Sequence, residues 1–473
     1  MRLQGLFMNI NGLLREINMV KLSEFVCITK VQTESDAEAL REDGYDVGFT
    51  LSEWETKYTL PADKIFYAKS PYSSMYYVDM DNPPYPIVVS LNIYGNQRLA
   101  MPEGEDDETF CQRILKHCDY YKDLHGDKLT LYISNLGGYL ATDVLREYVN
   151  RNEPSEEMFT TFFSVYEEVD FGGAWFSKEE MEKVLKGMGA ATQRKFRKLL
   201  HKLPDEVTIY RGEAEASAPY TKAFSWTTDI RVAYFFACRQ SDGYARVVSA
   251  KVKKQDILFM LDRRNEKEVL VFPEGIYGID TSSYVQIPPD EALSVLTDDD
   301  LDCFYWWRET VNLLYRYEAV PQDHSVLHSI RVLLLALLII ENEELVLKED
   351  DVAQLMQAIT FHDIGRQNGD EDPKHGEYST AIYKENHSDP VVEFLIQYHC
   401  VDDKKAKKAL DSDTRIKDKQ KVSLLYNVLK DADALDRVRF GLRDLDVRYL
   451  RIPISKQLVL TADQCLRQIR NGE

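Results

Sequence analysis

Residues 361–366 read Phe-His-Asp-Ile-Gly-Arg, and the stretch before them places Val352, Leu355, Met356 and Ile359 three or four positions apart. Apolar residues at this spacing predict a helix that turns one face to a core. The adjacent histidine and aspartate therefore emerge where the apolar stripe ends. Imidazole and carboxylate together are ligands of divalent metals, here Mn, Mg, Fe, Co, Ni or Zn without a choice among them.

Histidines gather around this stretch. Six of the nine (324, 328, 362, 375, 387, 399) lie within residues 322–400. Packing does not account for this density, because histidine is not a favoured core residue, so metal or phosphate chemistry is indicated. His324 and His328 stand at i and i+4 of a predicted helix, which lets one of them face a metal. A further helix carries Asp433 within residues 430–437.

This order of His, His-Asp and Asp resembles the HD superfamily of metal-dependent phosphohydrolases over roughly residues 304–440. The resemblance implies an all-α domain with four metal ligands: His328, His362, Asp363 and Asp433. It makes three further residues candidates for a second metal or for phosphate: His375, His399 and Arg366. Residues 362–379 also look like the phosphodiesterase module of SidE-type effectors, which act on ADP-ribosyl groups. That likeness implies a catalytic role for His324.

The middle of the chain has a different pattern. After Pro204, short β-like runs are predicted at residues 207–210, 245–252, 257–260, 269–272 and 284–287, with a helix at 232–237. Cleavage of the nicotinamide bond of NAD needs a cation for the pyrophosphate, a hydroxyl near the ribose and a carboxylate beside the oxocarbenium ion. Arg211 at the end of a strand, Ser225, and Glu268 at the head of a strand supply these groups in order. Because successive side chains of a strand point to opposite faces, Glu266 and Glu268 would place their carboxylates on the same face.

This order resembles the arginine-serine-glutamate class of mono-ADP-ribosyltransferases and exoenzyme-type toxins, over roughly residues 155–290. The resemblance implies a β-sandwich with helices and NAD as substrate. It implies NAD-binding roles for Arg211, Gly212, Ser225 and Thr227, with Gly212 allowing close backbone approach. Glu268 would stabilise the cation, and Glu266 would favour an arginine acceptor. The motif reads Ser-Trp-Thr where the class has Ser-Thr-Ser, so the acceptor, protein or nucleic acid, is left open.

Length and charge set the frame for these motifs. The 473 residues predict a multidomain α+β protein with an α/β region of unknown role at 1–150, a transferase-like domain at 151–296 and an HD-type domain at 297–473. A net charge of −21 disfavours extended nucleic-acid or anionic-membrane binding. The apolar run 332–340 is shorter than the ~18–20 residues of a membrane helix. No membrane partner and a cytoplasmic location are expected, with delivery into another cell left open.

Local patterns predict several elements outside these motifs. Strands are expected at 25–28, 87–91 and 129–133, helices at 109–121 and 140–149, and an irregular loop at 71–86. Ser177 and Glu180 form a predicted capping box, with Phe176 and Met181 at the spacing of a hydrophobic staple. Thr297 and the aspartates after it predict the start of another helix.

Three functions fit these motifs. The first is a bifunctional enzyme that transfers ADP-ribose from NAD and hydrolyses a phosphoester or pyrophosphate, related to what the first module makes. The second is an HD-type phosphohydrolase of dNTPs or guanosine alarmones, in which the transferase-like module only binds nucleotide. The third is a non-catalytic interaction or defence-sensor protein with both sites degenerate.

Overall fold

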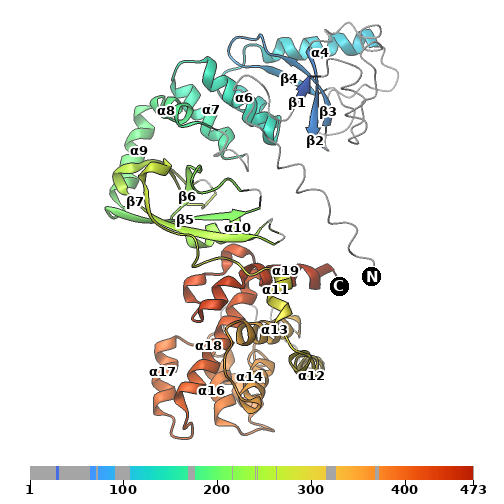
Figure 1. Ribbon diagram of the computed structural model, residues 1–473, viewed down its shortest axis with the longest axis vertical. Helices are drawn as coiled ribbons and strands as arrows, with labels where there is room; N and C mark the ends of the chain where they lie inside the picture. Colours follow the sequence, from blue (N-terminus) through green and yellow to red (C-terminus); the bar gives the residue numbers. More distant parts are fainter. Residues whose placement is uncertain are drawn as a thin grey trace. The chain divides into compact units, whose positions relative to one another are not determined.

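The computed structural model describes residues 28–30, 64–70, 73–90, 107–168, 176–215, 217–239, 241, 243–262, 264–315, 326–367 and 372–471. The chain divides into two compact units, Met1–Lys202 and Leu203–Glu473, which Figure 1 shows by colour along the sequence. Each unit is described by itself. The boundaries expected near residues 150 and 297 stay predictions.

The first unit joins a small sheet to helices. Its four strands pair antiparallel in chain order: β1 (Ile28–Lys30), β2 (Ile65–Ser70), β3 (Ser73–Asp79) and β4 (Ile87–Ser90). Six described helices follow: α4 (Asp107–Tyr121), α5 (Gly126–Asn135), α6 (Gly138–Arg151), α7 (Glu156–Tyr166), α8 (Lys178–Lys186) and α9 (Ala190–His201). The helices predicted at 109–121 and 140–149 and the strand at 87–91 are confirmed, although most of the run 25–28 lies outside the described residues.

Two predictions in this unit are wrong. The run 129–133, expected as a strand, belongs to helix α5, whose buried residues Leu129, Tyr132 and Ile133 recur at helical spacing. Its β-forming residues favoured a strand, but burial along a single face decides the outcome. The expected loop at 71–86 instead contains strand β3, whose Tyr76, Tyr77 and Val78 are buried between neighbouring strands.

Helix caps follow the sequence closely. The Ser177 side chain accepts a hydrogen bond from the Glu180 amide, and the Glu180 carboxylate accepts one from the Ser177 amide. Phe176 and Met181 are both buried beside this cap. The predicted box and the burial of its flanking apolar residues are therefore confirmed.

The second unit begins with an antiparallel sheet. Its strands are β5 (Glu206–Ala214), β6 (Ser225–Thr227), β7 (Ala245–Lys253), β8 (Ile257–Leu261), β9 (Glu268–Val271) and β10 (Ile276–Asp280), in the order β10-β7-β5-β6-β9-β8. Helix α10 (Ile230–Cys238) packs on β5 and β7 (Figure 1). The described strands form one hydrogen-bonded sheet, where the resemblance implied a sandwich of two. The strand expected at 284–287 is a single bridge between Arg246 and Val285, and β10 takes the edge position.

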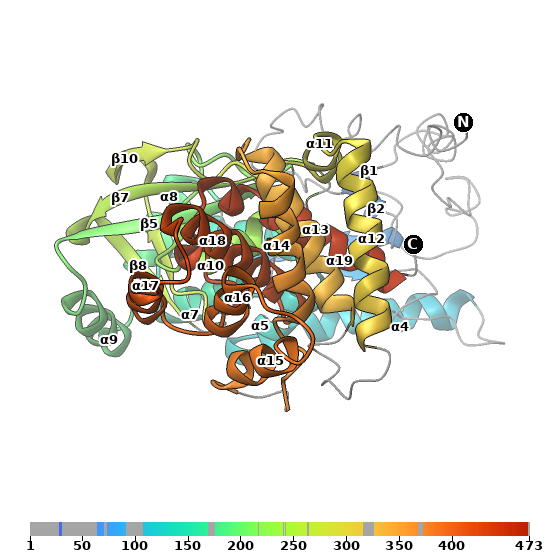
Figure 2. The same cartoon turned by 90° about the horizontal axis from the view of Figure 1, so that it is seen from below.

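Helices make up the rest of the second unit: α11 (Pro289–Ser294), α12 (Asp298–Leu314), α13 (Val326–Asn342), α14 (Glu349–Phe361), α15 (His375–Tyr383), α16 (Pro390–Tyr398), α17 (Asp403–Ser412), α18 (Lys419–Leu435) and α19 (Val459–Asn471). Thr297 caps α12 as predicted. Figure 2 shows α12, α13 and α14 side by side. Apolar residues 332–340 of α13 are nearly all buried, because other helices surround it. Among the described residues, no helix is long and apolar enough to span a membrane.

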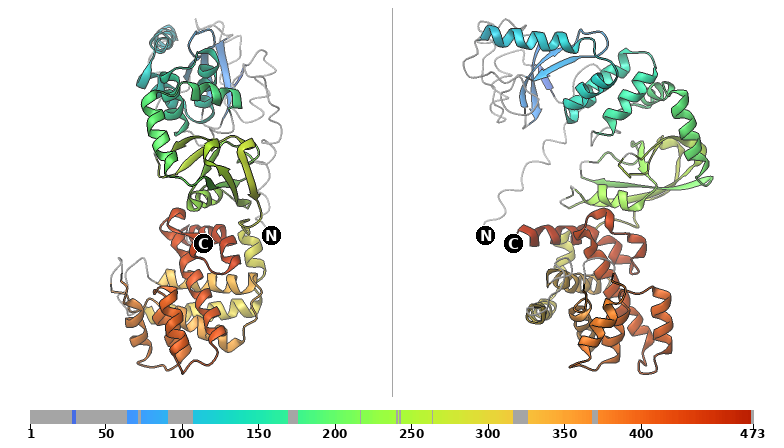
Figure 3. Two further views of the ribbon diagram at one scale, coloured as in Figure 1. Left: turned by 90° about the vertical axis from the view of Figure 1, so that its left-hand side faces the viewer. Right: turned by 180° about the vertical axis from the view of Figure 1, so that it is seen from behind.

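The sheet and the helices of this unit share one hydrophobic core. Ala233, Tyr234 and Ala237 of α10 belong to the same buried cluster as α13, α14 and α18. The Tyr234 hydroxyl donates to the Lys456 carbonyl at 2.9 Å, and the Gln286 amide nitrogen donates to the same carbonyl at 2.9 Å. Both views of Figure 3 show the C-terminal helices against the sheet.

Candidate functional site

The first histidine of the site comes from helix α13. His328 is buried, and its Nδ1 lies 2.7 Å from Oδ2 of Asp436, which follows the end of α18. Arg331, one turn after His328, donates to both oxygens of the same carboxylate. The partner of Nδ1 fixes the ring, so His328 turns Nε2 inward.

The second histidine stands at the end of helix α14. His362 is fully buried, and its Nδ1 lies 2.6 Å from the carbonyl oxygen of Ile359, to which only a protonated Nδ1 can donate. Its Nε2 lies 3.1 Å from Nε2 of His328. Since Nδ1 of His362 is the donor to Ile359, its Nε2 can only accept, and His328 can donate to it when protonated on both nitrogens. A divalent cation between the two rings would take the place of that proton.

A second pair of imidazoles repeats this arrangement. His375 Nδ1 hydrogen-bonds the Asp372 carbonyl, and His399 Nδ1 lies 2.7 Å from the Ile396 carbonyl. Their Nε2 atoms are 2.8 Å apart. Four imidazoles therefore have Nδ1 held by a carboxylate or carbonyl oxygen and Nε2 turned inward, as in histidines that ligate metals.

Asp363 lies between the two pairs. Its Oδ2 is 3.5 Å from Nε2 of His328 and 3.8 Å from Nε2 of His362. Its Oδ1 is 3.2 Å from Nε2 of His375 and 3.5 Å from Nε2 of His399. One carboxylate thus faces both pairs, with one oxygen toward each, a geometry that suits two cations joined by a carboxylate bridge.

Asp433 lies beside the first histidine pair, His328 and His362, and its carboxylate is partly exposed; we call the group of these residues and Asp363 the first pocket. Its Oδ1 is 3.4 Å from Nε2 of His328, and 35% of its side chain is exposed, against at most 3% for His328 and Asp363. Asp433 is therefore more exposed to solvent than His328 or Asp363. The neighbouring Asp431 is fully buried and accepts from the amides of Arg451 and Ile452, which makes it a structural residue.

Two glycines allow the helices of the site to approach. A Cβ on Gly365 would stand 2.3 Å from the Ser379 amide nitrogen of α15. A Cβ on Gly376 would stand 2.6 Å from the Gln397 carbonyl oxygen of α16. These contacts are closer than any side chain permits, so glycine at both positions brings the second histidine pair beside Asp363.

The carboxylates create a negative potential around the rings. Burial alone lowers the pKa of His328, but hydrogen bonds with Asp433 and Asp436 outweigh it and raise this pKa to about 9. For His375, burial again opposes the shift, and Asp363 raises the pKa to about 10. Burial lowers the pKa of His362 to about 4. A potential that holds protons on two rings also favours a divalent cation.

The residues fit a divalent metal. His328, His362 and Asp363 offer ligand atoms within 4.8 Å of one another, and His375, His399 and Cys400 do the same. Burial raises the pKa of Cys400, but its hydrogen bond with His375 and the charges of the two histidines bring the pKa down to about 7. Arg366 Nη1 is 3.9 Å from Oδ1 of Asp363, at a position suited to phosphate.

Sequence reasoning missed two residues of this centre. Asp436 follows Asp433 by three positions on the same helical face, a spacing that signals a shared site. Cys400 directly follows His399, and nothing in one sequence marks a single cysteine as a ligand. The predicted His324 lies outside the described residues.

The predicted NAD residues also lie together, on adjacent strands β5, β6 and β9. Arg211 donates from Nη1 to the Ser225 carbonyl at 2.9 Å and from Nη2 to the Ala218 carbonyl at 2.9 Å. The Ser225 hydroxyl donates to Oε1 of Glu268 at 2.5 Å. Arg211 is within β5 rather than at its end, since the strand continues to Ala214.

Three other predicted residues have structural partners. A Cβ on Gly212 would stand 2.0 Å from the Ala233 carbonyl oxygen, so this glycine admits helix α10. The Thr227 hydroxyl donates to the Glu266 carbonyl at 2.6 Å. Glu266 does not share the face of Glu268, because Lys267 between them has a left-handed φ of 46° that ends the alternation. The Glu266 carboxylate instead accepts from Arg443 at 3.1 Å.

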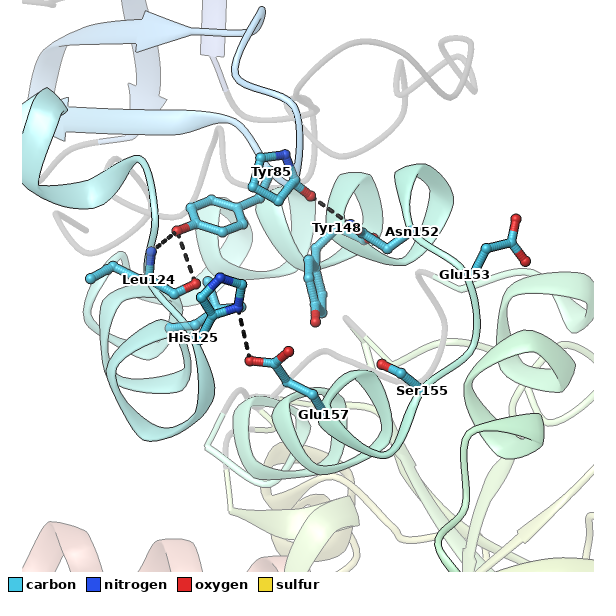
Figure 4. A pocket seen from close by; sticks show the side chains of 10 residues that line it. Tyr85, Leu124, His125, Tyr148, Asn152, Glu153, Ser155 and Glu157 are labelled. Carbon is cyan, nitrogen blue, oxygen red and sulfur yellow. Dashed lines mark hydrogen bonds and ion pairs between the residues drawn. The ribbon is translucent and has the colours of Figure 1, made fainter.

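Two cavities lie away from these clusters. One of about 140 Å³ in the first unit is lined partly by Tyr85, Tyr148, His125 and Glu157. Figure 4 shows two contacts of its lining: the Tyr85 hydroxyl bonds Leu124, and His125 faces Glu157 at 3.3 Å. The other, of about 310 Å³, is lined by Tyr220, Thr221, Pro273, Glu274, Ile276 and Ile279, none of which is a predicted NAD residue.

Comparison with protein families gives one match, to the HD domain, over residues 326–438. No curated protein and no solved structure matches the chain. The matched segment runs from the start of α13 past the end of α18 and contains the four imidazoles, Asp363 and Asp433. An HD domain implies a metal-dependent phosphohydrolase and binds divalent metals. The second unit of this chain therefore contains a helical HD domain at residues 326–438.

Proposed function

We propose that the HD domain is a two-metal phosphohydrolase that cleaves phosphoesters or pyrophosphates. One observation carries the proposal: the Nε2 atoms of four buried histidines, two on each side, turn toward the single carboxylate of Asp363. His328, His362, Asp363 and Asp433 would hold the first cation. His375 and His399, with the other oxygen of Asp363, would hold the second.

Residues around the two cations would admit the substrate, bind its phosphate and orient the ligands. Bound divalent cations supply polarisation of a phosphoryl oxygen and a lowered pKa of water. Asp433, which is one-third exposed, marks the side from which a phosphate enters. Arg366 lies beside Asp363 and offers a guanidinium to phosphate oxygens. Asp436, clamped by Arg331 and Arg439, keeps the His328 ring in place.

The experiment measures metal-dependent hydrolysis of bis(p-nitrophenyl) phosphate, ADP-ribose, dNTPs and guanosine tetraphosphate after loading with Mn²⁺. Hydrolysis that disappears on Asp363→Asn and persists in the matched variant Asp411→Asn supports the proposal. Asp411 is an exposed residue of α17 (Asp403–Ser412) and belongs to neither group of possible ligands. A metal-loaded protein that cleaves none of these substrates would refute it.

A second activity, ADP-ribosyl transfer from NAD by the β module, is favoured by one arrangement. Arg211, Ser225 and Glu268 stand on three neighbouring strands and are joined by hydrogen bonds of 2.9 and 2.5 Å. In this proposal Glu268 stabilises the sugar cation and Arg211 faces the pyrophosphate, while the HD domain acts on an ADP-ribosyl-derived product.

Labelled NAD tests both halves together. Nicotinamide release that is lost in Glu268→Ala and kept in Asp363→Ala supports the transfer step. A changed product pattern in Asp363→Ala alone supports linked chemistry. NAD left intact, with nucleotides hydrolysed normally in Glu268→Ala, would instead favour a phosphohydrolase whose β module only binds nucleotide. Neither turnover nor bound metal would favour a non-catalytic interaction protein.

A further inference from the structure

The second histidine pair has a neighbour that the phosphohydrolase proposal does not use. One ligand atom from each of His375, His399 and Cys400 lies within 4.8 Å of the others. The Nε2 atoms of the two histidines are 2.8 Å apart, and both face Oδ1 of Asp363. A sulfur atom therefore adjoins a pocket already lined by two nitrogens and one oxygen.

Local geometry explains how adjacent residues can both reach this pocket. Helix α16 ends at Tyr398, and the turn after it is closed by the Val401 amide, which donates to the Tyr398 carbonyl at 3.1 Å. His399 and Cys400 both belong to this turn, and one ligand atom of each reaches the same group as His375. On the facing helix, a Cβ on Gly376 would stand 3.1 Å from the Cys400 sulfur, so glycine there leaves room for it.

The two pockets consequently differ in ligand chemistry. The first presents two imidazoles and two carboxylates, from His328, His362, Asp363 and Asp433. The second presents two imidazoles, the shared carboxylate and a thiol. Soft thiolate ligands select zinc, iron or cobalt over the hard ions magnesium and manganese, which prefer oxygen.

We propose that Cys400 is a thiolate ligand of the second cation, so that the second pocket takes a zinc-like or iron-like ion. This inference rests on the proposed two-metal function. In the binding step the S–H bond breaks, a sulfur–metal bond forms, and the proton leaves to solvent, with no change of oxidation state. The two pockets then have different metal preferences although they share Asp363.

Cobalt reconstitution of the full chain tests the assignment. Wild-type protein loaded with two equivalents of Co²⁺ is expected to show a near-ultraviolet thiolate-to-cobalt charge-transfer band. Cys400→Ser is expected to lose the band and to bind the second equivalent about 10–100-fold more weakly, while retaining the first. The matched control Cys303→Ser removes a cysteine of α12 that lies outside both ligand groups, and it should keep the band.

Alkylation of wild-type protein supplies a measurement that needs no variant. Iodoacetamide labelling followed by mass spectrometry is expected to modify Cys400 in the metal-free chain and to spare it after cobalt loading. Two bound cobalt ions without the band, or labelling of Cys400 that cobalt leaves unchanged, would overturn the thiolate assignment and leave the phosphohydrolase proposal standing. Failure of the wild-type chain to bind any cobalt would overturn both.

Discussion

The candidate metal site of the HD domain and the polar cluster of the sheet, formed by Arg211, Ser225 and Glu268, both bring charged side chains together, but their hydrogen bonds differ. In the sheet, each donor meets an acceptor: Arg211 donates to the Ser225 carbonyl, and Ser225 donates to Glu268. In the HD domain, Nε2 atoms of His328 and His362 face each other at 3.1 Å with both Nδ1 atoms already engaged. The first arrangement joins donors to acceptors, whereas the second keeps extra protons on His328 and His375, which a divalent cation can replace.

The difference teaches that convergence alone is a weak sign of a ligand site. A cluster that satisfies its own hydrogen bonds serves folding as well as it serves binding. A cluster in which buried carboxylates raise the pKa of imidazoles indicates a negative potential that also favours a cation. On this criterion, the HD domain has the stronger claim to a ligand, and the sheet cluster must be tested for a structural role as well as for NAD binding.

The largest effect is expected from Asp363→Asn. Loss of the carboxylate that faces both pockets removes one ligand from each. Hydrolysis should therefore fall by at least about 100-fold, since even changes to residues that only orient the ligands cost about 10–100-fold. Bound metal, measured by mass spectrometry of the elements, should drop with it. Retention of two metals by Asp363→Asn would break the contrast between the two clusters.

Metal uptake should depend on pH in one direction. The pKa of His328 is raised to about 9 and that of His375 to about 10, so both rings hold protons at neutral pH that a cation must displace. Each displaced proton makes the apparent affinity fall by about tenfold per unit decrease in pH. Calorimetry in two buffers of different ionisation enthalpy measures this release, and an affinity independent of pH between 6 and 8 would contradict the prediction.

Gly212→Ala separates a structural from a ligand-binding role in the sheet. A Cβ placed 2.0 Å from the Ala233 carbonyl oxygen forces α10 off β5, and the cost is expected to be about 3 kcal/mol of unfolding free energy. Gly243→Ala, whose nearest neighbour would be a flexible carboxylate at 3.9 Å, is the control and should change little. Urea unfolding measures both; equal stability of the two variants would show that Gly212 is not needed for packing.

Ser225→Ala tests whether the sheet cluster contributes to stability without a metal, and a smaller loss of unfolding free energy is expected than for Gly212→Ala. Glu268 loses a donor at 2.5 Å, which should cost about 1 kcal/mol in unfolding free energy with or without metal. By contrast, His399→Gln should lower the thermal midpoint mainly in the metal-loaded protein, because bound ligand contributes to stability only where it binds. If chelation changes the effect of Ser225→Ala as much as that of His399→Gln, the two clusters do not differ as described.

The smallest effect is expected at Arg443, which links the two parts of the second unit. It donates to the Arg264 carbonyl at 2.9 Å and to Glu266 at 3.1 Å, and its guanidinium lies 4.4 Å from the centre of the Phe235 ring. A double-mutant cycle of Arg443→Ala with Glu266→Gln should give a coupling of about 0.5–1 kcal/mol in unfolding free energy. Additive effects of the two changes would remove this link.

The sequence predicted those parts of the site that depend on local spacing. His362 and Asp363 are adjacent at the end of an amphipathic helix, and the carbonyls that hold Nδ1 of His362 and His399 each stand three residues earlier, at Ile359 and Ile396. A helix therefore aims these rings by its own geometry. The approach of Asp436 to His328 and of Cys400 to His375 depends on how helices distant in sequence pack, which one sequence does not reveal.

The errors in the fold have the same origin. Residues 129–133 have strand-forming side chains, but their buried face follows the 3.6-residue period of a helix. Gly212 was assigned to ligand approach, whereas its neighbour is helix α10, whose position depends on pairing of β5 with β7. Residues 284–286 do contact the first residues of β7, through the Val247 and Gln286 amides, but the contact is too short to form a strand, and β10 pairs with the rest of β7.

The shared core of the second unit has a consequence for how the chain is made. Tyr234 and Gln286 find their carbonyl partner, Lys456, only 222 and 170 residues later in the chain. Translation adds ~5–20 residues per second, so on the order of ten to forty seconds pass between the synthesis of Tyr234 and that of Lys456. During this interval the apolar residues of α10 lack the helices that later cover them, so we expect chaperone binding while residues 235–456 are being translated.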